Sequence, residues 1–262
     1  MHVTAPLYRS LAALATLAAP AGSFAACSAQ SGPQTTALVE LYTSEGCSSC
    51  PPAEQVLARL PQVLGRGADA VAAALHVDYW DDLGWKDPYA RAEFSQRHRW
   101  LVQANHHSTI YTPHFFVNGG ELAGGQADLR AAVARANGEP AQAGIRLQAT
   151  LQAPASLHVA VSAHSRQPSP GQVLYLGLAQ GGLVSDVRRG ENSGRQLAHE
   201  HVLRTWSGPY ALAGGRLDLD EVLPLPAGSD PARLELLAVV QDRQTGRVLQ
   251  ALGTGACTGG PG

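Results

Sequence analysis

The sequence Cys47-Ser48-Ser49-Cys50 is the segment whose residue types and spacing most directly indicate chemistry. Two cysteines separated by two residues can bring their sulfur atoms within bonding distance on the first turn of a helix. A thiolate at Cys47 could attack a disulfide, and Cys50 could then resolve the mixed disulfide. The unpaired N–H groups and the positive dipole end of a helix start would lower the pKa of the attacking thiol. The motif therefore predicts a redox-active dithiol.

Other interpretations of the motif stay open. The pair could form a permanent structural disulfide, or it could bind a soft metal such as copper together with a nearby histidine. Zinc sites usually draw about four ligands from paired motifs. The chain has no second CxxC, and its other cysteines, Cys27 and Cys257, lie at opposite ends. We therefore expect no resident metal ion and no other cofactor.

Glu40 and Pro113 are two further candidates for the catalytic site. Glu40 stands in an apolar stretch seven residues before Cys47. If it lies beneath the dithiol, a raised pKa would let its carboxyl exchange the resolving proton, although it could also point to solvent. Pro113 directly precedes an apolar segment, where proline often marks a cis or tight turn, although an ordinary trans proline would also fit.

Several polar and aromatic groups could support such a site. Tyr79, Trp80 and Trp85 could form a wall for a partner polypeptide or simply pack in the core. A polar loop at residues 188–195 could bind an anion, interlock with the first half of the chain or form a solvated turn. His199 and His201 would share one face of a strand and could bind a metal with a third ligand, which the sequence does not identify.

The elements that must position the CSSC motif follow from hydrophobic periodicity. Before residue 139 the pattern predicts strands at residues 37–42, 70–77 and 114–118, and helices at residues 53–64, 89–104 and 126–136. This alternation implies an α/β layer, with the motif between the first strand and the first helix.

The second half of the chain has a different pattern. Short segments with period-2 alternation, separated by Gly, Pro, Asp or Ser, predict strands at residues 145–151, 157–163, 173–179, 199–206 and 234–241. Such a pattern is typical of an all-β sandwich. The sequence thus predicts two domains, at residues 35–139 and 140–262.

Four stretches carry a resemblance to a known family: VELYTSEGCSSCPPAE, HVDYWDDLGWKDP, YTPHFFVNG and RRGENSGRQLAHEHVLR. The first half resembles a thioredoxin-fold domain. The whole chain is similar to a bacterial family of exported thioredoxin-like proteins, domain of unknown function 1223. The resemblance implies an α/β thioredoxin-like N-terminal domain followed by an all-β sandwich-like C-terminal domain. It also implies Cys47 as attacking thiol, Cys50 as resolving thiol and Pro113 as a cis residue beside them.

The chain departs from thioredoxin itself at the motif. Gly46 stands where thioredoxin has Trp, and the intervening dipeptide is Ser-Ser instead of Gly-Pro. These differences leave the redox potential and the partner open.

The N-terminus predicts export. Arg9 precedes an apolar run at residues 11–22, and small residues follow, which is typical of a secretory signal peptide covering residues 1–26. Cleavage after Ala25 fits best. A lipoprotein acylated at Cys27 and an uncleaved helix are the alternatives. The run is shorter than the roughly 20 residues that a bilayer span needs. We expect a periplasmic or secreted mature chain without a transmembrane segment, in which Cys27 and Cys257 could form a disulfide.

Composition limits the partners. The chain has 19 basic and 21 acidic residues, so it lacks the basic surplus that nucleic-acid binding requires. The sequence favours an exported thiol–disulfide oxidoreductase that acts on a protein thiol or disulfide client or redox partner. The alternative is a non-catalytic exported binding module in which the CSSC motif is a structural disulfide or a soft-metal ligand.

Overall fold

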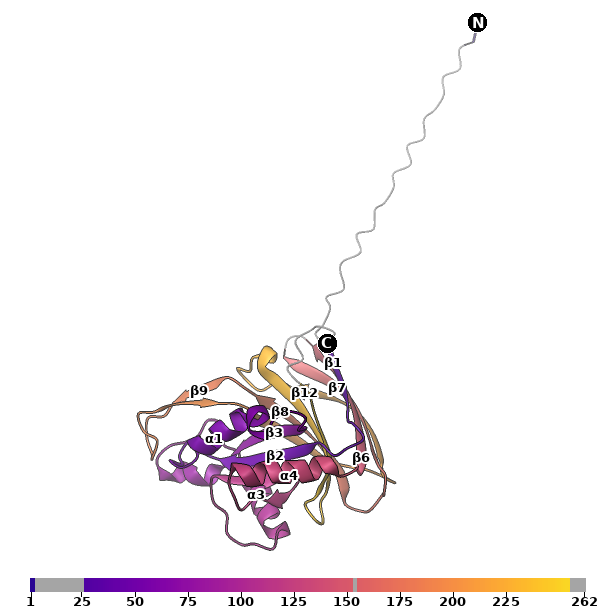
Figure 1. Cartoon of the computed structure of the whole chain (residues 1–262). Coiled ribbons are helices and arrows are strands. Elements are labelled where there is room, and N and C mark those ends of the chain that lie inside the picture. The colour runs from indigo at the N-terminus through magenta and orange to yellow at the C-terminus, as the bar shows by residue number, and fades with distance from the viewer. Residues whose placement is uncertain (3–25, 153–154, 255–262) are drawn as a thin grey trace.

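The computed structural model describes residues 1–2, 26–152 and 155–254, and contains fourteen strands and four α-helices within them. Figure 1 shows the helices gathered at one end of a large sheet, with a second sheet at the other end. A strand hairpin made of β9 (Leu183–Asp186) and β10 (Gln196–His199) extends beside α1 (Pro51–Ala58).

The large sheet has eight strands in the order β14-β13-β8-β11-β3-β2-β4-β5. Their bounds are β2 (Ala37–Thr43), β3 (Ala70–His76), β4 (His114–Val117), β5 (Gly120–Glu121), β8 (Gln172–Gln180), β11 (Val202–Ala211), β13 (Leu234–Asp242) and β14 (Val248–Thr254). The two halves of this sheet join where Val202 pairs with Ala74 in parallel. The Ala74 N–H donates to the carbonyl of His201 at 2.8 Å, which satisfies the edge of β3.

The second sheet is antiparallel, with the order β1-β6-β7-β12. Its strands are β1 (Ala26–Gln30), β6 (Ala143–Gln152), β7 (Ser156–Ser165) and β12 (Arg216–Pro224). Leu147 and Val161 of this sheet share a buried core with Leu176 and Leu236 of the large sheet. The two sheets therefore pack face to face at this end.

Helices cover the other end of the large sheet on both faces. Alternate residues of β2 point to opposite sides, as the pleat requires. Leu41 packs with α1, α2 (Leu60–Leu64) and α4 (Gln126–Gly138). Leu38 packs with α3 (Ala92–Ala104). Two 3₁₀ helices, η1 (Asp78–Leu83) and η2 (Pro231–Arg233), lie in the connections.

The predicted fold class is wrong. An α/β thioredoxin-like domain followed by a separate β-sandwich would keep the strands of the two halves in different sheets. Instead, one eight-stranded sheet takes four strands from before residue 139 and four from after it. The physical reason is the pairing of β3 with β11, which hydrophobic periodicity cannot reveal because it reports burial and not strand partners. The individual strands and helices predicted in the first half nevertheless lie close to the observed ones.

Some predictions fall on residues outside the described part. Residues 3–25 are among them, so the signal peptide and its cleavage site stay predictions. Cys257 is another, and the Cys27–Cys257 disulfide also stays a prediction. Among the described residues, no helix combines the length and apolar character needed to cross a bilayer.

Candidate functional site

Cys47 and Cys50 are joined by a disulfide, with an S–S distance of 2.06 Å, directly before α1. The Cys47 N–H donates to the Ser44 carbonyl at 3.1 Å, and the Cys50 N–H donates to the Cys47 carbonyl at 3.2 Å. The segment between β2 and α1 is therefore a tight turn that holds the two cysteines together.

Neither cysteine of the disulfide is exposed, since the relative exposure of each is 0%. Ser48 and Ser49 between them face solvent. The helix start offers few N–H donors to a thiolate, because proline at positions 51 and 52 has none. The N–H groups of Ala53 and Glu54 both donate to the Cys50 carbonyl. Stabilisation of a Cys47 thiolate would thus have to come from other groups.

The disulfide turn is covered by residues 187–195, the loop between β9 and β10, which we call the cover loop. Asn192, which is fully buried, donates its Nδ2 hydrogens to the carbonyls of Glu45 and Cys47, both at 2.9 Å. The Ser48 N–H donates to Glu191 Oε2 at 2.9 Å, and hydrogen bonding to Ser48 lowers the pKa of Glu191. Of the three interpretations of this polar loop, the structure favours the interlock with the first half of the chain.

A buried imidazole lies between two carboxylates that flank the disulfide in sequence. His199 Nε2 is 3.1 Å from Glu45 Oε1, and His199 Nδ1 is 2.7 Å from Glu54 Oε2. Burial alone would lower the pKa of His199, but the hydrogen bonds to Glu45 and Glu54 outweigh it and raise the pKa to about 9. Glu54 follows Cys50 by four residues, so the two share one face of the helix start.

A second buried imidazole, His76, is paired with Asp87. His76 Nδ1 lies 2.7 Å from Asp87 Oδ2, and both side chains are fully buried. Burial opposes the imidazolium, but the charge of Asp87 outweighs it and raises the pKa of His76. Asp87 also accepts the N–H groups of Glu45 and Tyr89, each at 2.8 Å. Its carboxylate is therefore held in a fixed orientation.

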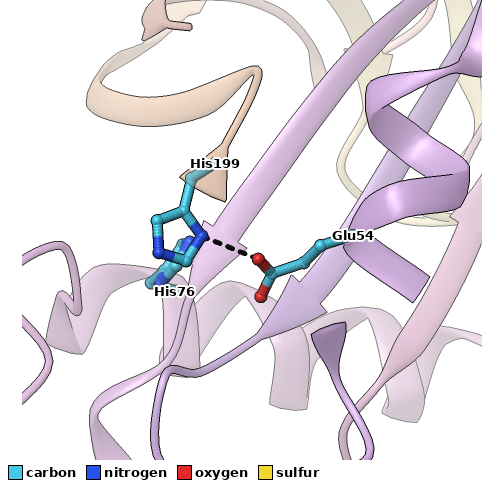
Figure 2. Close-up of side chains that lie close together, drawn as sticks. All are labelled: Glu54, His76 and His199. Atoms are coloured by element: carbon cyan, nitrogen blue, oxygen red, sulfur yellow. Dashed lines mark hydrogen bonds and ion pairs between the residues drawn. The ribbon is translucent and has the colours of Figure 1, made fainter. Parts of the chain in front are cut away.

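Glu54, His76 and His199 point toward one another (Figure 2), and one donor atom of each lies within 4.8 Å of the others. They come from α1, the end of β3 and the end of β10. Glu54 Oε1 accepts the hydroxyl of Thr43 at 2.6 Å. The sequence had paired His199 with His201, but the backbone of His201 has a positive φ of 56° and breaks the alternation. His201 Nδ1 instead contacts Glu235 at 3.0 Å.

The sequence missed Glu45, Glu54, His76 and Asp87. One usable signal was the charged Glu54 in the first turn of a helix whose other contacts are apolar. The pairing of distant residues left no signal in the sequence, because His199 lies 154 residues from its partner Glu45.

Glu40 is buried, which is one of the two orientations that the sequence left open, and its hydrogen bonds run to Arg97 and Tyr42. Its Oε1 accepts Arg97 Nε at 2.7 Å, its Oε2 accepts Arg97 Nη2 at 3.2 Å, and the Tyr42 hydroxyl donates to Oε1 at 3.2 Å. Burial opposes the charge of Arg97, but the Glu40 carboxylate raises its pKa above the ordinary value. The carboxyls that flank the disulfide turn are thus Glu45 and Glu54, and a proton-transfer role for Glu40 stays a prediction.

Pro113 follows a cis peptide bond with Thr112 and stands directly before β4, which pairs with β2. Its catalytic role stays a prediction. Of the aromatic residues, Trp85 donates Nε1 to Glu45 Oε2 at 2.7 Å, and Tyr79 and Trp80 pack against the core beneath α3. The three aromatic side chains are partly buried, and Trp85 is the one that bonds to a carboxylate of the site.

With this geometry established, the comparisons with known proteins identify the family. Residues 38–241 match the family described as "Protein of unknown function (DUF1223)". The chain belongs to this family. The resemblance to this family, which the sequence predicted, is confirmed. No curated protein matches the chain.

Two solved structures share the fold of this DUF1223 protein. Protein AGR_C_4864 from Agrobacterium tumefaciens is 21% identical with a TM-score of 0.60, over 86% of this chain and 96% of that chain. HBP35 of Porphyromonas gingivalis is 14% identical with a TM-score of 0.68, over 88% of this chain and 78% of that chain. At these identities the likeness concerns the fold alone.

Proposed function

We propose that this protein is exported and exchanges thiols and disulfides with a protein client or redox partner through Cys47 and Cys50. The observation that carries the proposal is the Cys47–Cys50 disulfide at the start of α1, beside a buried group of imidazoles and carboxylates. Export rests on the N-terminal sequence alone, and it would place the cysteines where disulfides persist.

The exchange conserves electrons and protons. A client thiolate attacks the sulfur of Cys47, the Cys47–Cys50 bond breaks, and Cys50 leaves as a thiolate that takes up a proton. A second client thiol then attacks the mixed disulfide and releases Cys47. The client loses two electrons and two protons, and the protein gains them. The reverse sequence reduces a client disulfide.

Access to the disulfide must be gated, because both cysteines are fully buried. Asn192 and Glu191 fasten the cover loop to the disulfide turn through three hydrogen bonds. Local opening of such a loop costs less free energy than global unfolding. Exchange therefore requires a minor, open population of the cover loop.

The complete burial of the cysteines also favours a second candidate, a non-catalytic binding module with a structural disulfide. In that case the bond would fix the turn that carries Glu45. Reduction would then loosen the site without transferring electrons to a client.

Exchange with a reduced model peptide containing two thiols separates the candidates. The oxidised protein should convert the peptide to its disulfide while Cys47 and Cys50 become reduced, as differential alkylation and peptide mass would show. With the peptide in its disulfide form, Cys50→Ser should accumulate a mixed disulfide at Cys47, because the Cys47 thiolate displaces one peptide sulfur as a thiolate and no Cys50 thiol resolves the new bond. Cys47→Ser, the matched control, should form no mixed disulfide at position 47. If the wild-type protein oxidises no peptide and Cys50→Ser traps none, the disulfide is structural.

A further inference from the structure

The buried residues Glu54, His76 and His199 lie in the arrangement of a metal-binding site. Their donor atoms come from three separate elements and converge on one point (Figure 2), all within 4.8 Å of one another. Their relative exposures are 9%, 0% and 2%, so the donors are shielded from competing water. Zinc binds nitrogen and oxygen donors at about 2.0–2.2 Å, so the side chains would need to close inward by only about an ångström.

Each imidazole already has a carboxylate on the nitrogen that faces away from this point. His76 Nδ1 contacts Asp87 at 2.7 Å, and His199 Nε2 contacts Glu45 at 3.1 Å. Such a carboxylate fixes the ring and directs the lone pair of the other nitrogen toward a metal. Both carboxylates are held in turn, Asp87 by the N–H of Tyr89 and Glu45 by the indole of Trp85.

An unpartnered polar atom independently points to a ligand. His76 is fully buried, yet its Nε2 atom has no hydrogen-bond partner. Buried polar atoms of this kind normally have a partner, and a bound ion is one way to supply it. The two remaining donors, His199 Nδ1 and Glu54 Oε2, meet each other at 2.7 Å beside it.

We propose that Glu54, His76 and His199 bind a divalent first-row transition-metal ion of the zinc class. Two imidazoles and one carboxylate suit such ions. Calcium and magnesium prefer shells made of oxygen donors. Three protein ligands leave a coordination position for water or a small ligand. The proposed metal site lies beside the disulfide turn, but its donors are distinct from Cys47 and Cys50, which carry the proposed exchange.

Titration of metal-free full-length mature protein with Zn²⁺ and Co²⁺ tests the site. We expect one ion per chain, a visible Co²⁺ absorption spectrum without a sulfur charge-transfer band, and a higher melting temperature with Zn²⁺. Glu54→Gln and His76→Gln should each weaken Zn²⁺ binding at least tenfold. His201→Gln, at a histidine between β10 and β11 that lies outside the site and contacts Glu235, is the matched control and should bind like the wild type.

Two further variants keep the test decisive. Asp87→Asn leaves all three ligands in place and should weaken Zn²⁺ binding by about tenfold to a hundredfold. The Cys47→Ser, Cys50→Ser double variant should bind unchanged. Absence of stoichiometric binding by the wild-type protein would overturn the proposal. So would unchanged affinity in folded Glu54→Gln and His76→Gln proteins, or loss of binding in the double cysteine variant, which would assign the metal to the cysteines.

Discussion

At the scale of single residues, Asn192 links the cover loop to the disulfide turn. It comes from the second half of the chain, yet its side chain donates to the carbonyls of Glu45 and Cys47 at the CSSC turn. Its own Oδ1 accepts Arg195 Nη1 at 2.7 Å. The buried amide of Asn192 thus makes two of the three hydrogen bonds that we describe between the cover loop and the disulfide turn, and Glu191 accepts the third.

Asn192→Ala should speed reduction of the Cys47–Cys50 disulfide by dithiothreitol. The Glu45 carbonyl loses its Asn192 donor and the Cys47 carbonyl keeps only the Cys50 N–H, which weakens the closed state by about 1–3 kcal/mol and raises the open population about fivefold to 160-fold. Samples quenched by alkylation at timed intervals give the rate of disulfide reduction. Ser193→Ala is the control, because Ser193 is exposed and bonds only within the loop. Equal rates in both variants would show that the cover loop does not limit access.

His98 should make the protein less stable in acid. Its Nε2 lies 2.8 Å from His114 Nδ1, and burial together with the charge of His114 lowers the pKa of His98 to about 3. The unfolded chain, with a pKa near 6.5, binds a proton first as the pH falls, so stability decreases below about pH 6.5. Between pH 7 and pH 5 this amounts to about 2 kcal/mol.

Urea unfolding at a series of pH values measures the effect of His98. The control is His98→Gln, which keeps a hydrogen-bonding group but cannot be protonated. The difference in unfolding free energy between pH 7 and pH 5 should shrink by about 2 kcal/mol in this variant. An identical pH dependence in the two proteins would contradict the assigned role.

The sequence could predict the chemistry of neighbouring residues but not that of distant ones. Cys47 and Cys50 are close in sequence, so their spacing alone predicts a bond. The apolar neighbours of Glu40 made burial one possibility, but they left a solvent-facing side chain open as well. Its partner Arg97 is 57 residues away, and a short-range pattern holds no information on such a pair.

At the scale of elements, the strands and helices of the first half could be predicted because their periodicity is strong. β2 is buried along its whole length, as its apolar sequence indicates. β12 was missed although Leu217 and Leu219 alternate with Asp218 and Asp220, which is the period-2 pattern of an edge strand with one face exposed. The hairpin of β9 and β10 was missed because its strands have only four residues each.

The turn between β4 and β5 fits against the turn between β13 and β14. Gly119 has a φ of 82°, and a Cβ atom there would lie 1.9 Å from the carbonyl oxygen of Gly246. Gly119→Ala should therefore destabilise the fold by about 2 kcal/mol or more. Gly138→Ala, at the end of α4 with open space around it, should be neutral or stabilising by up to about 1 kcal/mol. Chemical denaturation measures the unfolding free energy of both variants. Equal stabilities would show that the two turns do not pack closely.

At the scale of the whole molecule, the two halves are joined by more than the pairing of β3 with β11. Arg97 of α3 donates to Glu40 of β2 and, through Nη1 at 3.0 Å, to Gln241 of β13. Gln250 of β14 accepts the Thr36 N–H at 2.8 Å and donates to the Gln34 carbonyl at 3.0 Å. Buried polar pairs of this kind are costly to separate.

The full chain should therefore unfold in one cooperative transition. Trp fluorescence and far-UV circular dichroism should give the same urea midpoint, because a single sheet runs through both halves. A fragment of residues 35–139 should not show a cooperative transition, because it leaves the edge of β3 unpaired and lacks Leu203, Leu237 and Val248, which complete the apolar cluster beneath α3. Two separate midpoints in the full chain would contradict a shared core.

The equilibrium between Cys47–Cys50 and a series of glutathione redox buffers is the most direct measurement of the proposed function. Differential alkylation read by peptide mass gives the fraction of the disulfide at each potential. A reversible two-electron curve that is the same from the oxidised and the reduced protein, with a midpoint inside the range of glutathione, is the expected result. A disulfide that stays oxidised throughout that range in the folded protein, and is reduced only when the chain unfolds, would show that the bond is structural.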